Sequence, residues 1–191
     1  MIFLKTLCVI LAGIILGLAA TYYSVNREIK FGAVHAGPWI AFPRAGSIEA
    51  DPYARAVVSR TAEIPLGLAE GLAFIATTDE TGGKLDPRCD YIVGGSIPAA
   101  RDWTVTLMDP LGRLIENQAR RYGFTSAALL RAADGAFTIT ISRTARPGNW
   151  LPLGEAKDFD IVLHLYDTPV SATAATLGAA AMPSITRGRC A

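Results

Sequence analysis

The chain opens with a long apolar run that no charge interrupts. It covers residues 6–26, "TLCVILAGIILGLAATYYSVN". About 20 helical residues, each rising roughly 1.5 Å, cross a hydrocarbon layer about 30 Å thick. Tyr22 and Tyr23 stand near the end of the run, and aromatic side chains of this kind gather at membrane surfaces. The pattern predicts a transmembrane anchor at residues 6–26, preceded by a cytoplasmic N-terminus at residues 1–5.

A cleaved secretory signal is the alternative for this segment, because "GLAA" at residues 17–20 offers small residues to a signal peptidase. The apolar run exceeds the usual length of a signal's hydrophobic region, which favours an uncleaved anchor. Either way, the rest of the chain is exported. Gly13 and Gly17 form a GxxxG pair, which permits a homodimer through this helix face; glycine is also common in membrane helices without that role.

The pattern changes after the apolar run. Residues 27–50 are rich in Gly, Ala and Pro and lack a clear period, so they predict an extended connector. Asp51 followed by Pro52 has the signature of a helix start, with an N-cap and a proline at the first helical position. The sequence therefore predicts a short helix at the start of a domain that covers residues 51–191.

Apolar and polar residues then alternate with a period of two, which is typical of strands with one drier face. The predicted strands are 72–78, 89–95, 103–109, 137–142 and 159–167. We expect the first two to pair across a hairpin tip that begins at Asp79. Residues 125–135 predict one or two helical turns and an Asp134-Gly135 turn, while 171–182 fit either a short helix or an irregular arm.

Several short strands with few helices predict a mainly β fold, a jelly-roll-like antiparallel β-sandwich with one or two short helices, preceded by the transmembrane helix. A length of 191 residues suits one domain with an appendage. The net charge is +1 and the basic residues are dispersed, which excludes an electrostatic surface for nucleic acid.

Cysteine and histidine usage bounds the chemistry. Apart from Cys8, the chain has Cys89 and Cys190, an even pair in a domain predicted to lie outside the cytoplasm. We expect a disulfide between them; two unrelated thiols are the alternative. The sequence has two histidines, no CxxC motif and no phosphate-binding glycine loop, so no metal and no cofactor are expected.

Four residues are candidate ligand-binding residues: Arg101, Trp103, Tyr122 and His164. Arginine and aromatic side chains are the usual anchors of binding sites and interfaces. The alternative is structural: Trp103 fills the core, Arg101 pairs with an acid, and His164 is a packed strand histidine. A serine-hydrolase elbow is poorly supported, because "GGSIP" lacks the second glycine of GxSxG.

The segment "NWLP" lies between two predicted strands. We interpret Asn149, Trp150 and Pro152 as a structural corner. Trp150 turns inward to close one end of the sandwich, Asn149 hydrogen-bonds the bend and Pro152 stiffens the exit. A catalytic loop is the alternative interpretation.

Five blocks, in this order and spacing, resemble the bacterial family known as domain of unknown function 1214: "DPYARAVVSRTAEIPLGLAEGLAF" (51–74), "LDPRCDYIVGGSIPAARDWTVTLMDPLGRLI" (85–115), "RYGFTS" (121–126), "PGNWLP" (147–152) and "FDIVLHLYDTP" (159–169). The resemblance implies an exported, mainly β domain in small alphaproteobacterial proteins with an N-terminal membrane segment. It also implies a companion of the unknown-function 1254 family, and it supplies no catalytic residues. The chain departs from the family at Met108, where many relatives have Tyr, and at His164, where Arg is usual.

These observations lead to one functional hypothesis and two rivals. The leading hypothesis is a binding or interaction module held in the inner membrane with its main domain in the periplasm, working with a companion envelope protein. The first rival is an envelope enzyme acting on a carbohydrate or small organic compound, since jelly rolls host such sites. It requires the candidate residues to converge with a carboxylate in one pocket. The second rival is a purely structural envelope protein.

Overall fold

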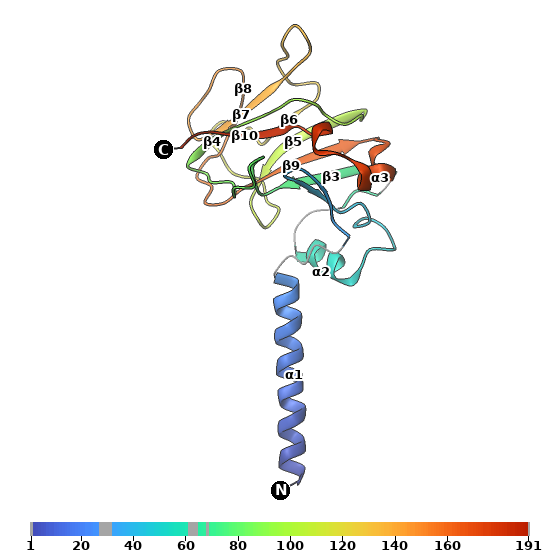
Figure 1. Ribbon diagram of the computed structural model, residues 1–191. Helices are drawn as coiled ribbons and strands as arrows, with labels where there is room; N and C mark the ends of the chain where they lie inside the picture. The colour runs from blue at the N-terminus through green and yellow to red at the C-terminus, as the bar shows by residue number, and fades with distance from the viewer. Residues whose placement is uncertain (1, 27–31, 61–64, 68, 191) are drawn as a thin grey trace.

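The computed structural model describes residues 2–26, 32–60, 65–67 and 69–190. A single long helix, α1 (Ile2–Asn26), projects from a β-rich body (Figure 1). Its stretch Ile2–Tyr23 is the one helix in the described residues that is long and apolar enough to cross a membrane, and none of it is buried against the body. The predicted N-terminal apolar helix is confirmed.

The body consists of two β-sheets. The first has six strands in the order β1-β2-β3-β9-β5-β6, and the second has four in the order β10-β4-β7-β8. The six strands are β1 (Val34–Ala36), β2 (Trp39–Ala41), β3 (Gly71–Ala76), β9 (Asp160–Tyr166), β5 (Asp102–Met108) and β6 (Gly123–Thr125). The four are β10 (Ser184–Cys190), β4 (Cys89–Gly94), β7 (Thr138–Ser142) and β8 (Asn149–Pro152). The predicted mainly β sandwich is confirmed. All pairs are antiparallel except β7 with β8, which is parallel.

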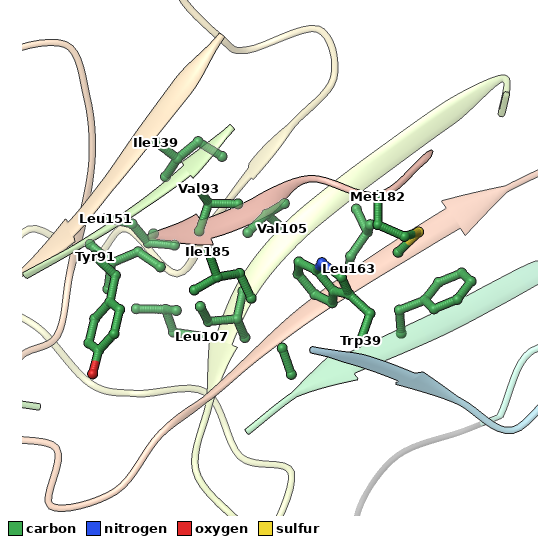
Figure 2. Packing of buried hydrophobic residues seen from close by; sticks show 14 of the residues in the cluster. Trp39, Tyr91, Val93, Val105, Leu107, Ile139, Leu151, Leu163, Met182 and Ile185 are labelled. Carbon is green, nitrogen blue, oxygen red and sulfur yellow. The ribbon is translucent and has the colours of Figure 1, made fainter. Parts of the chain in front are cut away.

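The core lies between the two sheets and is built from the inward members of each alternating strand (Figure 2). In β5 and β9 these are Val105, Leu107 and Leu163, which are fully buried. The opposite sheet contributes Ile139 and other aliphatic side chains. Because these strands bury one face each, the period of two in the sequence located them correctly.

The core also holds an aromatic hydrogen-bond donor, Trp39, from the hairpin β1–β2. Trp39 is completely buried, and its Nε1 donates a hydrogen bond of 2.7 Å to the carbonyl of Pro183, just before β10. Figure 2 shows Trp39 beside Leu163 and Met182. This contact joins the first hairpin of the body to its last strand.

One predicted pairing is wrong. Strands β3 and β4 do not form a hairpin with each other, because β3 pairs with β2 and β9, whereas β4 pairs with β10 and β7. The tip at Asp79 does close on itself, with a bridge between Thr78 and Lys84. The chain then crosses to the second sheet, where β4 pairs with strands that are distant in the sequence.

The predicted limits of the body also change. Residues 34–41 form β1 and β2 at the edge of the six-stranded sheet, so part of the expected connector 27–50 belongs to the body. The predicted helix is confirmed as α2 (Pro52–Arg60). Residues 126–137 contain turns but no helix, which corrects the helical turns expected there. The turn at Gly135 is confirmed, with a φ of 82° that favours glycine.

The end of the chain contains structure that its sequence did not predict. The arm after β9 forms a short helix, α3 (Val170–Thr173), and two 3₁₀ turns, Ala174–Thr176 and Ala179–Ala181. The last strand, β10, buries Ile185 alone, so it has no apolar alternation to read. The predicted disulfide is confirmed: Cys89 in β4 is bonded to Cys190 in β10 across 101 residues.

Candidate functional site

The four predicted ligand-binding residues do not meet in one pocket. Trp103 faces the core, where it is 6% exposed and packs on Phe137 with ring centroids 5.0 Å apart. The guanidinium of Arg131 lies over both rings, 6.0 Å and 5.6 Å from their centroids. This cation–π stack closes the loop before β7 over the core. Trp103 is therefore a core residue, which is the structural role given as the alternative to ligand binding.

Arg101 and Tyr122 lie at opposite ends of β5. Arg101 precedes the strand and faces the Asp167 carboxylate at 3.7 Å, with both side chains more than 70% exposed. The backbone N–H of Leu107, near the other end, donates to the carbonyl of Tyr122. The Tyr122 hydroxyl donates to Glu116 at 3.0 Å, and this hydrogen bond raises the pKa of the phenol.

His164 is on the face of β9 that points away from the core. Its ring stacks on Tyr166, with centroids 6.0 Å apart and planes 13° apart. Among the described residues, its buried Nδ1 atom has no hydrogen-bond partner. Burial lowers the pKa of the imidazole, so His164 is neutral at pH 7. It is separated from Trp103 by the sheet itself, so the convergent pocket required by the enzyme hypothesis is not assembled from these four residues.

The outer face of the six-stranded sheet is the more informative surface. The registers place Ile40, Ile75, Val162 and Thr106 in one row across four strands. The neighbouring row contains Ala73, His164, Thr104 and Thr125. We call these eight residues the outer face.

Two polar atoms on the outer face have no partner in the part of the chain that the structure describes: Thr106 Oγ1 and His164 Nδ1, both buried. Because Thr106 is opposite Val162 and His164 is opposite Thr104, the two are diagonal neighbours, roughly 7–8 Å apart. A buried polar atom without a partner costs free energy, about 1–3 kcal/mol in proteins. A ligand or protein that shifted the covering side chains and supplied these hydrogen bonds would therefore be stabilised at the outer face.

Sequence reasoning selected His164 but missed Thr106. Both lie on the polar side of their own strand's alternation, and this signal was present in "WTVTLM" and "DIVLHLY". Their proximity depends on the pairing of β5 with β9, which the sequence does not reveal. The second histidine, His35 in β1, lies opposite Ile40, at the far side of the same sheet. No group of three metal-ligating side chains occurs within the described ranges.

A second surface is a polar cleft of about 630 Å³ lined by residues 84–88, 143 and 155–158. Its charges are largely paired with one another. Lys84 Nζ lies 2.7 Å from Asp158, and Arg88 lies 2.6 Å from Asp86. The hydrogen bonds from the Arg88 side chain and backbone lower the pKa of Asp86 to about 2. The internal ion pairs leave little charge in this cleft for an ionic ligand.

The segment expected to form a corner is a strand. Asn149–Pro152 is β8, paired in parallel with β7. Asn149 is buried, accepts a hydrogen bond from the backbone N–H of Leu130 and donates to the carbonyls of Leu130 and Thr138. Trp150 is half-buried and donates from Nε1 to the Ser142 carbonyl at 3.1 Å. These side chains hold the loop before β7 and the end of β7, and Pro152 is buried at the end of the edge strand.

A polar cluster that the sequence did not single out stabilises the tip between β3 and β4. Asp79 is buried, and its Oδ1 accepts hydrogen bonds from the N–H groups of Thr81 and Gly83 and from the Thr81 hydroxyl. Arg187 of β10 lies 2.9 Å from its Oδ2. Burial acts to raise the pKa of Asp79, but these hydrogen bonds and Arg187 outweigh it and lower the pKa. The cluster is structural, since it joins the tip to the last strand.

Comparison with known proteins gives a family and two structural likenesses. The family described as "Protein of unknown function (DUF1214)" matches residues 70–170. The crystal structure of the VPA0106 protein from Vibrio parahaemolyticus is 24% identical, with a TM-score of 0.55, over 65% of this chain and 32% of that protein. A putative uncharacterized protein from Burkholderia cenocepacia is 19% identical, with a TM-score of 0.43, over 78% of this chain and 48% of that protein. The comparison with curated proteins gives no match.

The Vibrio structure shows that the fold is shared, and the chain spans about a third of the length of that protein. The match over 70–170 includes strands β3 to β9, which contribute to both sheets of the sandwich. It confirms the resemblance seen in the five sequence blocks: the chain belongs to the DUF1214 family of proteins of unknown function.

Proposed function

We propose that this protein is a membrane-anchored binding module whose outer face receives a partner in the cell envelope. The observation that carries the proposal is the pair of buried, unpartnered atoms, Thr106 Oγ1 and His164 Nδ1, on a face that mixes threonines with aliphatic side chains. Both are polar groups that a bound molecule could satisfy if the side chains covering them shift, and further burial of the half-buried Ile40 and Ile75 would add hydrophobic stabilisation.

The location of the module is part of the proposal. The apolar helix α1 supports a single-pass anchor, and the Cys89–Cys190 disulfide supports an oxidising compartment. In bacteria these two features together fit an inner-membrane protein with residues 1–5 in the cytoplasm and the β-body in the periplasm.

The partner we propose is a companion envelope protein of the unknown-function 1254 family, as the family resemblance suggests. A homodimer through Gly13 and Gly17 is a second proposed contact. A Cβ added at either glycine would meet no other atom within 4 Å, so this helix face is open to a second helix. The two contacts are compatible, because one uses α1 and the other uses the β-body.

Site-specific photocrosslinking in intact membranes tests the proposal. A photoreactive phenylalanine at Tyr166, next to His164, is expected to capture a second protein, which mass spectrometry identifies. The control places the same group at Ile92, which is 44% exposed on the outer side of the four-stranded sheet. Capture from position 166 but not from 92 supports the proposal. Recovery of the chain alone from both positions, as a monomer with no bound molecule, would contradict it.

A further inference from the structure

We propose that the loop carrying Ile48 inserts its side chain into the surface of the lipid bilayer beside the exit of α1. This inference rests on the anchoring role of α1 given under the proposed function. It adds a second membrane contact, which would set the orientation of the β-body on the membrane.

Ile48 is the most exposed large hydrophobic residue in the described part of the chain, with 93% of its surface accessible. Isolated exposed hydrophobic residues are common on protein surfaces, so exposure alone indicates little. The position of this residue and the rigidity of its loop make it informative.

The loop before α2 is ordered by its own hydrogen bonds. The N–H of Ser47 donates to the Arg44 carbonyl at 3.0 Å, and the N–H of Ala50 donates to the Ser47 carbonyl at 3.2 Å. The Ser47 hydroxyl also donates to Arg44 at 2.9 Å and accepts from the N–H of Glu49. The turns therefore hold the loop in one shape that presents Ile48 outward, instead of allowing the side chain to fold back onto the body.

Arg55 connects this loop to helix α2. Its guanidinium donates to the carbonyl of Ile48 at 2.6 Å and to the carbonyl of Ala50 at 3.0 Å. Ala50 is 7% exposed, so the loop is pinned on one side while Ile48 points away. The position of Ile48 is thus determined by the position of α2.

Helix α2 lies against the end of α1, between that helix and the β-body (Figure 1). If the apolar stretch ending at Tyr23 fills the hydrocarbon layer, a helix in contact with α1 lies within about one helix diameter, roughly 10 Å, of the layer's edge. The polar interface of a bilayer is about 5–8 Å thick on each side. Because the Ile48 carbonyl is bonded to Arg55 of α2, Ile48 lies close to the same edge, and an aliphatic side chain that faces the lipid surface there would be stabilised by burial.

The free thiol of the chain makes the test direct, because Cys8 lies in α1 and the other two cysteines are bonded. The full chain is reconstituted in vesicles of phosphatidylethanolamine and phosphatidylglycerol. An environment-sensitive fluorophore is attached to Cys8 in the wild type, or to the introduced thiol in Ile48→Cys and Leu130→Cys, both in a Cys8→Ser background. Leu130 is the matched control: it is 69% exposed and is hydrogen-bonded to Asn149 in β8, a strand far from α1 in Figure 1.

We expect the probe at 48 to emit at shorter wavelength than the probe at 130, to be quenched by lipid-borne nitroxide and to be shielded from aqueous iodide. The probe at 130 is expected to behave in the opposite way. Three results would overturn the inference. The probe at 48 could be as open to iodide as the probe at 130 while Cys8 is quenched within the acyl chains, in which case the anchor stands and the lipid contact fails. It could be shielded from iodide but unaffected by lipid nitroxide, which indicates a protein contact. Cys8 itself could be unaffected by acyl-chain nitroxide, in which case the anchor and the inference fail together.

Discussion

Replacement of Asn149 by alanine tests how β8 is held in the fold. The Asn149 side chain is 7% exposed and makes three hydrogen bonds to backbone groups, all between 2.8 and 2.9 Å. They connect β8 to the loop at Leu130 and to the first residue of β7, Thr138. Alanine cannot make any of them, and the freed backbone groups lie in a partly buried region beside β7 and β8.

The magnitude follows from these bonds. A typical intramolecular hydrogen bond contributes about 0.5–1.5 kcal/mol net, so the loss of three is worth about 3 kcal/mol in the free energy of unfolding. For a domain of this size, about 2–4 °C of melting temperature corresponds to each kcal/mol, so the melting temperature should fall by roughly 6–12 °C. Asn149→Asp keeps the acceptor for the Leu130 N–H but turns a buried carboxylate oxygen toward the carbonyls of Leu130 and Thr138, so at neutral pH its loss should be at least as large as that of alanine.

Asn117 provides a matched control. Its side chain also makes three backbone hydrogen bonds, to Ile115 and Arg121, but in a more exposed turn where water can replace them. Asn117→Ala should therefore lower the free energy of unfolding by no more than about 1 kcal/mol. The assay is urea unfolding of the full chain in detergent, followed by tryptophan fluorescence. Equal losses for Asn149→Ala and Asn117→Ala would refute the reasoning, because burial of the hydrogen bonds would then have no energetic consequence.

Three further predictions concern other parts of the fold. Replacing both Cys89 and Cys190 by alanine should lower the free energy of unfolding by about 2–5 kcal/mol, and hydrogen exchange in β10 should accelerate; unchanged exchange there would contradict the role of the bridge. Asp79→Ala should lower the free energy of unfolding in urea by about 2–4 kcal/mol, because removing a fully buried carboxylate leaves its hydrogen-bond donors without an acceptor. Asp109→Ala should cost less: Asp109 also accepts from two backbone N–H groups, but its side chain is 23% exposed. Because the pKa of His164 is lowered in the fold, the unfolded chain binds a proton at a higher pH than the folded chain does, so stability should fall as the pH drops below about 6.5. His164→Gln should make this fall smaller in melting curves recorded across pH. An identical pH profile for the two proteins would contradict the prediction.

The strands that could be predicted are those in which burial alone decides the pattern. β5, β7 and β9 each place alternate apolar residues in the core, so a period of two located them within a residue or two. β1, β2 and β10 were missed because they are short or bury little, and they are strands only because a neighbour pairs with them. The pairing of β3 and β4 was predicted wrongly for the same reason: pairing depends on contacts between distant segments, which local alternation does not record.

The features of the candidate site were likewise predictable only in part. The disulfide could be predicted because the domain was expected to lie outside the cytoplasm, and two cysteines in such a domain have few alternatives. The set of Arg101, Trp103, Tyr122 and His164 was chosen by residue type, and type does not tell which face of a strand or which end of a sheet a side chain occupies. Thr106 belongs with His164 only through the register of β5 with β9.

The most direct test of the central claim, a β-domain held outside the cytoplasm by an uncleaved helix, is the intact mass of the protein purified from membranes without reduction. The account predicts a mass that includes the N-terminal helix and is lighter by two hydrogens than the fully reduced chain of 20.3 kDa, because Cys89 and Cys190 are bonded. The mass of a chain that begins after the small residues at 17–20, or of a chain whose three cysteines are all free thiols, would contradict the account.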